Sequence, residues 1–292
     1  MLPARFEYHR PSTLDEAVQT LSAHADDAKI LAGGQSLIPL LKLRFAEPGH
    51  LIDINRIGGL DAIEEDGGAL RVGSLARHNA LAGSDLIAKR SPLMATAAPL
   101  ISDPVVRNLG TIGGSLAHAD PAGDWGSVML AAGATVRLKG PNGERELPIA
   151  EFLQDTFTTA LEPDEILTEV LVPIPSGRSG GTYLKMERKV GDFATVGVAV
   201  QLELSNGTVE RAGIALTAVS SRNVEATDAE GVLAGSEPSE EAFAEAARSA
   251  AAAADPISDV RGSAEYKRHV VEVFVRRGLQ RSLALARSEG GN

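Results

Sequence analysis

Two short glycine-centred segments are the parts of this chain best suited to hold an anion. Residues 32–36 (AGGQS) and 111–115 (TIGGS) each place a glycine pair beside a short polar residue, next to apolar sequence. A glycine pair permits positive φ angles and lets the backbone approach a ligand with no Cβ in the way. Successive backbone N–H groups in such a turn can form a concave nest for a phosphate. We therefore expect the two segments to hold one pyrophosphate from two sides.

Each segment also allows a simpler interpretation, because a glycine pair on its own is usually just a turn. Neither segment matches the dinucleotide-binding pattern GxGxxG or the P-loop pattern GxxxxGK[ST], so a Rossmann domain or an NTPase is not supported. Two similar segments in one chain do fit a nucleotide held between two subdomains.

Three further polar residues have two interpretations each: Asp124 and His118 after the second segment, and Lys185 at the start of the second domain. Asp124 could accept hydrogen bonds from a ribose or adenine, or it could cap the helix expected to begin near Trp125. Lys185 could face a phosphate or a flavin edge, or it could lie on a solvated strand face. His118 is interpreted as a polar loop residue, because a catalytic histidine needs an orienting partner that the sequence does not show.

The sequence carries no motif for substrate chemistry of its own. It has no GxSxG nucleophile motif, no HExxH metal motif and no recognisable pair of catalytic carboxylates. We therefore expect no catalytic residue in this chain. If the protein is an enzyme, a bound cofactor supplies the chemistry.

The composition excludes several classes of protein. The chain of 292 residues has 28 basic and 39 acidic residues, a net charge of −11, whereas a nucleic-acid-binding protein usually presents a basic surface. Cysteine is absent, which excludes disulfides, thiolate zinc sites and cysteine-ligated iron–sulfur clusters from this chain. The six histidines are scattered, and no two have the spacing of a helical zinc motif, so the sequence predicts no metal site.

Hydropathy bears on where the protein works. The chain has no apolar run of the roughly 20 residues that a membrane-spanning helix needs. Residues 1–12 (MLPARFEYHRPS) lack the apolar core of a secretory signal. We expect a protein that does not span a membrane and that works in the cytoplasm.

The elements that position the first segment form an α/β unit. A helix is expected over residues 12–24, where Thr13 and Glu16 fit a capping box. Residues 29–31 predict a buried strand that runs into the first segment, and Pro39 favours a short or irregular helix after it. Residues 50–54 predict a second strand.

Later residues predict an α+β arrangement with a boundary near residue 176. Helices are expected over residues 76–88 and 92–101 and a helix near 126–132, hairpins over 62–74 and 135–149, and a strand over 166–172. The Pro- and Gly-rich run 173–181 predicts a linker. Beyond it, apolar and other residues alternate over 196–204 as in a half-buried strand. Asn206 and Gly207 predict a hairpin turn before a return strand over 208–219. Helices are expected from Ser239 to Asp255 and over 265–287. The expected domains are residues 1–176, divided into about 1–57 and 58–176, and residues 177–292.

Seven blocks of the sequence resemble the FAD-binding medium subunit of the molybdenum hydroxylases, the group of aerobic carbon monoxide dehydrogenase and xanthine dehydrogenase. The resemblance extends in order over nearly the whole chain. The blocks that carry it are FEYHRPSTLDEAVQTL, ILAGGQSLIPLLKLR, HLIDINRI, ISDPVVRNLGTIGGSLAHADPAGD, EPDEILTEVLVP, YLKMERKVGDFATVGVAV and RGSAEYKRHVVEVFVRR.

The resemblance implies an FAD-binding domain of two α/β subdomains (PCMH-type), then a smaller C-terminal α+β domain with an antiparallel sheet. It implies that FAD binds non-covalently, with the pyrophosphate on the two glycine segments, Ile101 near the flavin and Asp124 at the ribose–adenine end. Ser115 stands where the family often has Asn. The implied FAD contacts are Ala32, Gly33, Gly34, Gln35, Ser36, Ile101, Thr111, Ile112, Gly113, Gly114, Ser115, Asp124, Leu167 and Lys185.

The resemblance also implies partners. A large subunit would hold the molybdenum–pterin centre and a small subunit the [2Fe-2S] clusters, in a dimer of heterotrimers. This chain would pass electrons from the clusters through FAD to an external acceptor, and the substrate could be carbon monoxide, a purine, an N-heterocycle or an aldehyde. Two alternatives are a stand-alone flavin oxidase or reductase of similar fold and a non-enzymatic partner-binding module.

Overall fold

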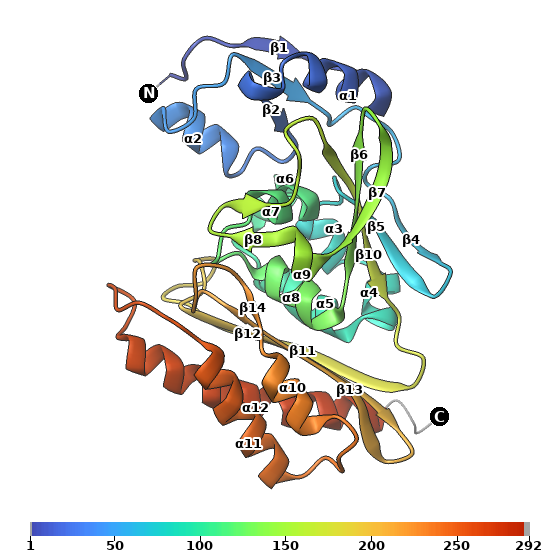
Figure 1. Ribbon diagram of the computed structural model, residues 1–292, viewed down its shortest axis with the longest axis vertical. Helices are drawn as coiled ribbons and strands as arrows, with labels where there is room; N and C mark the ends of the chain where they lie inside the picture. The colour runs from blue at the N-terminus through green and yellow to red at the C-terminus, as the bar shows by residue number, and fades with distance from the viewer. Residues whose placement is uncertain (1, 289–292) are drawn as a thin grey trace.

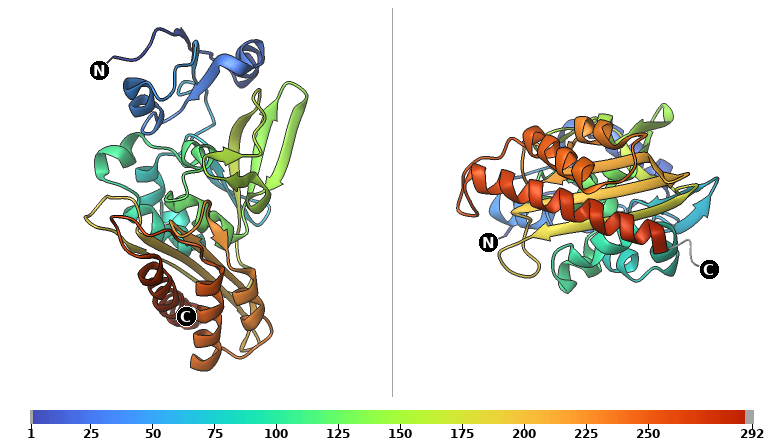
Figure 2. Two further views of the ribbon diagram at one scale, coloured as in Figure 1. Left: turned by 60° about the vertical axis from the view of Figure 1, so that its left-hand side comes forward. Right: turned by 90° about the horizontal axis from the view of Figure 1, so that it is seen from below.

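Three units follow one another down the long axis of the molecule (Figure 1). The computed structural model describes residues 2–288. An N-terminal α/β unit lies at one end, a unit built on a five-stranded sheet lies in the middle, and a four-stranded sheet covered by long helices forms the other end (Figures 1 and 2). The middle unit therefore touches both of the others.

The N-terminal unit is a parallel three-stranded sheet in the order β1-β3-β2. Helix α1 begins where the capping box predicts, because the Thr13 hydroxyl accepts a hydrogen bond from the Glu16 amide at 3.2 Å. Helix α2 is short, and Pro39 lies in its first turn, where an amide has no intrahelical partner to lose. The elements are β1 (Glu7–His9), α1 (Leu14–Ala23), η1 (Ala25–Asp27), β2 (Ala28–Leu31), α2 (Leu37–Leu43) and β3 (His50–Asp53).

The middle unit packs short helices against an antiparallel sheet in the order β4-β5-β10-β6-β7. Its strands are β4 (Ile63–Asp66), β5 (Ala69–Gly73), β6 (Thr135–Gly140), β7 (Gly143–Pro148), β8 (Leu153–Asp155), β9 (Thr158–Thr159) and β10 (Ile166–Pro173). Its helices are α3 (His78–Ala82), α4 (Asp85–Arg90), α5 (Pro92–Ala97), η2 (Ala98–Leu100), α6 (Pro104–Leu109), α7 (Ile112–His118), α8 (Asp124–Ala132) and α9 (Ile149–Phe152).

Two helix predictions in the middle unit were wrong in their extent. The helix expected over residues 76–88 is two helices, because the Ser84 hydroxyl accepts a hydrogen bond from the Ile87 amide at 3.3 Å and starts α4 afresh. The helix expected over 92–101 is α-helical only to Ala97 and continues as the 3₁₀ turn η2, which contains Pro99.

The C-terminal unit is an antiparallel sheet in the order β11-β12-β13-β14, with helices on its outer face (Figure 2). Val196, Val198 and Val200 face these helices, while Ala199 on the other side of β12 belongs to the core of the middle unit. The strand predicted to be half-buried is therefore buried on both faces. The elements are β11 (Arg178–Met186), β12 (Val196–Ser205), β13 (Thr208–Thr217), β14 (Val224–Glu225), α10 (Thr227–Leu233), α11 (Glu240–Ala253) and α12 (Ala264–Ser288).

The glycines of the predicted linker belong in part to a strand. Strand β11 starts at Arg178, so Gly180 and Gly181 lie inside the sheet rather than in a connection. A Cβ on Gly180 would lie 2.0 Å from the Ser282 carbonyl oxygen of α12, and one on Gly181 would lie 2.6 Å from the Leu93 Cβ of α5. The glycines mark a close approach of helices to both sides of β11.

We predict that Gly180→Ala lowers the free energy of unfolding by about 1–3 kcal/mol, because the new methyl group pushes α12 away from β11. Urea denaturation measures the change. The control is Gly231→Ala in α10, where nothing lies within 4 Å of the added Cβ and alanine favours the helix, so stability should rise or stay the same. Equal stability of Gly180→Ala and the parent would contradict the close approach.

Candidate functional site

The first glycine segment connects β2 to α2 at the carboxyl end of the parallel sheet. Gly34 has a φ of +72°, which turns the chain in a conformation that glycine favours. Within residues 2–288, the backbone N–H groups of residues 33–36 have no protein acceptor. A row of unpaired amides in a glycine turn is the arrangement that binds phosphate.

The second glycine segment is the start of a helix and not a loop. Thr111 is the N-cap of α7, and its hydroxyl accepts a hydrogen bond from the Gly114 amide at 3.1 Å. The amides of Ile112 and Gly113 donate to the carbonyl oxygens of Ala76 and Ser74 at 3.1 and 2.9 Å. The amides without a protein acceptor therefore lie in the first segment, whereas the amides of residues 112–115 are bonded within the protein.

The fold brings the two segments together. A Cβ on Gly33 would lie 2.4 Å from the Leu109 carbonyl oxygen and 2.8 Å from the Gly110 Cα. A Cβ on Gly114 would lie 3.7 Å from the Cβ of Ala32. Gly33 must be glycine because the backbones of the two units almost touch there, whereas a Cβ on Gly114 would make only ordinary van der Waals contact with Ala32.

Asn55 and Arg77 join the two segments, and neither residue was predicted from the sequence. The Asn55 side-chain amide donates to the Ala32 carbonyl oxygen at 2.8 Å, and Arg77 donates to the Asn55 side-chain oxygen at 2.6 Å and to the Leu109 carbonyl oxygen. Burial lowers the pKa of Arg77 from its ordinary value, which still leaves the guanidinium charged at neutral pH. No sequence pattern marks these residues, because they meet only through the tertiary fold.

Asp124 and Lys185 meet at the joint between the middle and C-terminal units. Asp124 is the first residue of α8, but Gly123 is the N-cap and the carboxylate makes no capping bond. Its oxygens instead accept hydrogen bonds from the Tyr183 hydroxyl at 2.7 Å and the Lys185 ammonium at 2.9 Å. Neither the capping role of Asp124 nor the solvated strand face of Lys185 applies, since the Lys185 side chain is only 2% exposed.

The electrostatics of this joint follow from its burial. Burial raises the pKa of Asp124, while the Lys185 ammonium and the Tyr183 hydroxyl oppose the shift. Burial and the neighbouring Asp124 raise the pKa of Tyr183 well above its ordinary value, so Tyr183 donates as a neutral phenol. Lys185 also donates to the Leu100 carbonyl oxygen at 3.0 Å, which places Ile101 beside the same joint.

The remaining predicted positions are more scattered. Leu167 is buried in β10, within the core of the middle unit. His118 is the last residue of α7 rather than a loop residue, and its ring lies 5.0 Å from that of Phe157, centroid to centroid. Burial lowers the pKa of His118, opposed by Asp120.

His78 lies beneath the second segment and was also missed. A Cβ on Gly110 would lie 2.8 Å from the His78 ring, and the Trp125 indole N–H donates to its Nδ1 at 3.0 Å. Burial, with Arg107 and Arg77 nearby, lowers the pKa of His78 to about 4. His78 is therefore neutral at pH 7 and serves as an acceptor that supports the segment.

Two family models divide almost the whole chain between them. Residues 4–175 match the FAD binding domain in molybdopterin dehydrogenase, and residues 181–282 match the CO dehydrogenase flavoprotein C-terminal domain. The chain belongs to this family of molybdopterin dehydrogenase flavoproteins. The predicted family, the fold class, FAD as the cofactor and the oxidoreductase class are confirmed.

This molybdopterin dehydrogenase flavoprotein is similar to relatives over nearly its full length. It is 43% identical to the carbon monoxide dehydrogenase medium chain of Hydrogenophaga pseudoflava, over 97% of this chain and 99% of that one. The solved carbon monoxide dehydrogenase of that organism, which lacks the Mo-pyranopterin moiety of its molybdenum cofactor, matches with a TM-score of 0.94 at 45% identity, over 97% of this chain and 99% of that one. Quinoline 2-oxidoreductase of Pseudomonas putida 86 matches with a TM-score of 0.90 at 33% identity, over 99% of both chains.

We predict that Arg77→Met weakens FAD binding about tenfold, because the variant loses hydrogen bonds that hold the flavoprotein's two glycine segments together. Titration of the apoprotein with FAD, followed by flavin fluorescence, measures the dissociation constant. The control is Arg90→Met, which removes a surface ion pair with Glu65 in α4 and β4 and should leave the constant unchanged. An unchanged constant in Arg77→Met would show that the bridge does not position the site.

We also predict a pH dependence that comes from His78. Its pKa is about 4 in the folded protein against about 6.5 unfolded, so the unfolded chain takes up a proton first as the pH falls. The contribution of His78 to stability is therefore present above pH 6.5 and is lost between about pH 6.5 and 4, on the order of 3 kcal/mol.

Urea denaturation of the parent and of His78→Gln across this pH range tests the prediction. Gln keeps an acceptor for Trp125 but does not titrate, so the variant should lose less stability on acidification than the parent. Parallel curves for the two proteins would contradict the assignment.

Proposed function

We propose that this flavoprotein is the medium subunit of a molybdenum hydroxylase complex and passes electrons from [2Fe-2S] clusters of a partner subunit through FAD to an external acceptor. Family membership supports this proposal. The single structural observation that carries it is the row of unpaired amides at residues 33–36, held against the second segment. The chain has no cysteine, so the clusters would be held by another subunit.

The first segment fits the pyrophosphate of FAD. Its free amides supply hydrogen-bond donors, its glycines allow close approach, and the Arg77 guanidinium adds a positive charge on the side of the middle unit. On the other side, α7 presents Gly114 beside Ala32. We propose that residues 32–36 and 111–115 bind the pyrophosphate, with Thr111, Ile112, Gly113, Gly114 and Ser115 as the wall opposite the amides.

The joint around Asp124 fits the remainder of the cofactor. Each oxygen of its carboxylate accepts one hydrogen bond from the protein, and an ionised carboxylate has capacity for more. We propose that Asp124 also accepts from a ribose hydroxyl, and that Ile101, Leu167 and Lys185 complete the FAD contacts. On this view residues 1–176 form the FAD-binding domain, with subdomains near 1–57 and 58–176, and residues 177–292 form the C-terminal domain.

The role of this chain is to hold and orient the cofactor. FAD, when bound, supplies reversible uptake and release of electrons. The protein residues bind its phosphates, fix its position through the Asn55–Arg77 bridge and bury one end at the joint of two units. No acid or base of this chain is needed, and we propose that the cofactor is bound non-covalently.

In the proposed complex, the other subunits determine the substrate and supply the electrons. Two of the solved relatives are a carbon monoxide dehydrogenase and a quinoline 2-oxidoreductase, and both folds match this chain over 97% or more of its length. We propose that a large molybdenum–pterin subunit selects the substrate, that a small [2Fe-2S] subunit delivers the electrons, and that the complex is a dimer of heterotrimers in the cytoplasm. In residues 2–288 no helix has the length and apolar character to cross a membrane.

The test compares two glycines that both have a positive φ angle. Gly34 has a φ of +72° in the first segment, and Gly59 has a φ of +86° in a turn where nothing lies within 4 Å of an added Cβ. Gly34→Val should abolish FAD binding, whereas Gly59→Val should keep about one FAD per chain. Visible absorbance of the purified proteins, with the extracted cofactor identified by chromatography, gives the stoichiometry.

Three outcomes would contradict the proposal. Stoichiometric FAD in Gly34→Val would remove the phosphate-binding role of the first segment. Oxidation of a substrate by the isolated chain, without a molybdenum subunit, would favour a stand-alone flavin oxidase. Flavin that stays with the protein after acid precipitation would contradict non-covalent binding.

A further inference from the structure

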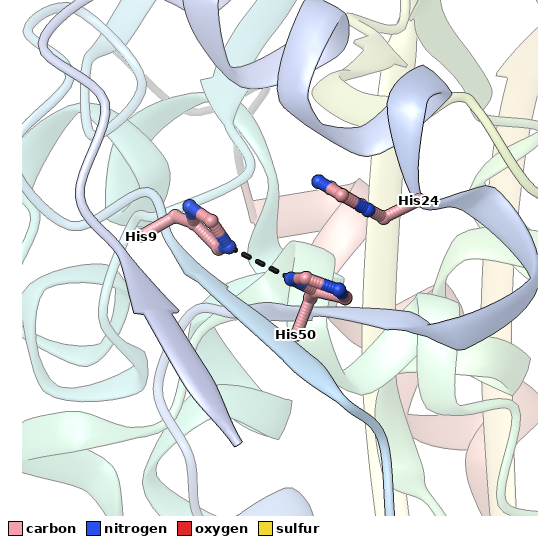
Figure 3. Close-up of side chains that lie close together, drawn as sticks. All are labelled: His9, His24 and His50. Carbon is pink, nitrogen blue, oxygen red and sulfur yellow. Dashed lines mark hydrogen bonds between the residues drawn. The ribbon is translucent and has the colours of Figure 1, made fainter.

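Three of the six histidines, which are far apart in the sequence, meet in the N-terminal unit (Figure 3). His9 ends β1, His24 follows α1 as its C-cap, and His50 begins β3. One nitrogen from each ring lies within 4.8 Å of the other two. The spacing of the histidines along the chain predicted no metal site, but the fold brings three of them close together.

The geometry of the pair His9 and His50 is close to that of two ligands on one ion. The His9 Nε2 and the His50 Nδ1 are 3.0 Å apart. Two nitrogens on a tetrahedral zinc ion, each bonded at 2.0–2.1 Å, are about 3.3 Å apart. If these two nitrogens moved apart by about 0.3 Å, they would have the separation of two ligands on one ion.

His24 and Glu7 are placed to complete such a site. The His24 ring is stacked on His50 with the ring centroids 3.7 Å apart, so it reaches an ion by turning out of the stack about its own side-chain bonds. A carboxylate oxygen of Glu7 lies 3.7 Å from the His50 Nδ1. All three histidines are partly buried, which limits competition from water while leaving an entry path.

We propose that His9, His24 and His50 bind one divalent transition-metal ion of the zinc class, with Glu7 or a water as the fourth ligand. Neutral imidazole suits zinc, nickel and copper, whereas magnesium and calcium prefer oxygen ligands. The ion ties the ends of β1 and α1 to the start of β3. It is a structural site that fixes the N-terminal strand to the unit that carries the first glycine segment.

The site is separate from the proposed FAD site. Strands β2 and β3 are parallel, and His50 pairs with Ala28 at the start of β2. The first glycine segment follows Leu31 at the other end of β2, about 10 Å away along the strand. Loss of the metal therefore leaves FAD binding in place, so the two proposals fail independently.

Calorimetric titration of the chelator-treated, full-length chain with Zn²⁺ tests the proposal. The expected result is saturable binding of one ion per chain, weakened about tenfold or more in His9→Ala, His24→Ala and His50→Ala. The control is His269→Ala, which changes an exposed histidine of α12 and should bind as the parent does. The melting temperature should rise with Zn²⁺ in the parent and the control but not in the three variants, and FAD content should be the same in all five proteins.

Substitution with Co²⁺ gives a readout that needs no variant. Ligation by three histidines should give the intense visible bands of four-coordinate cobalt, at wavelengths beyond the flavin absorbance. No stoichiometric Zn²⁺ binding, equal binding by the parent and His24→Ala, or only the weak absorbance of hydrated Co²⁺ would each overturn the proposal.

Discussion

The close contact between the backbones of Gly33 and Leu109 is the constraint on which the arrangement of the site depends. Two units of different architecture, one a parallel sheet and the other antiparallel, meet backbone to backbone at this point. Any larger residue at Gly33 would separate them and open the space between the two segments. The contact alone does not fix the angle between the units. The Asn55–Arg77 bridge does, because it binds the carbonyl oxygens on both sides of the contact.

A second joint, between α8 and the C-terminal sheet, is fixed by polar groups rather than by close backbones. Helix α8 is buried over its whole length, and most of what surrounds it is apolar. Within that setting Asp124, Lys185, Tyr183 and Thr217 satisfy one another's hydrogen bonds. Buried charges contribute little net stability, but an unpaired one is strongly unfavourable. The joint therefore favours one alignment of the C-terminal sheet against α8. Its polar contacts contribute more to the specificity of this alignment than to the stability of the protein.

Local sequence signals predicted local structure well. Thr13 and Ser239 begin helices as their capping chemistry indicates, and Asn206 and Gly207 make the expected hairpin turn. Both glycine segments were identified, although one is a helix start. The predictions failed where a residue's role depends on contacts with residues distant in the sequence. Gly180 and Gly181 suggested a linker, because the sequence alone does not distinguish a glycine in a turn from a glycine packed against a helix. Asn55, Arg77 and His78 were not predicted, because their hydrogen-bond partners are distant in the sequence.

The different state of the two glycine segments has a consequence for how a ligand enters. The amides at the start of α7 are bonded within the protein, so that side of the site has its shape before any ligand arrives. The amides of residues 33–36 have no acceptor within residues 2–288, so in the proposed site phosphate oxygens supply the acceptors. One half of the proposed site therefore has its amides bonded within the protein, and the other half has donors free for a ligand. In the proposed site, the ordering cost of binding therefore falls on the four residues 33–36, since the other side is ordered during folding.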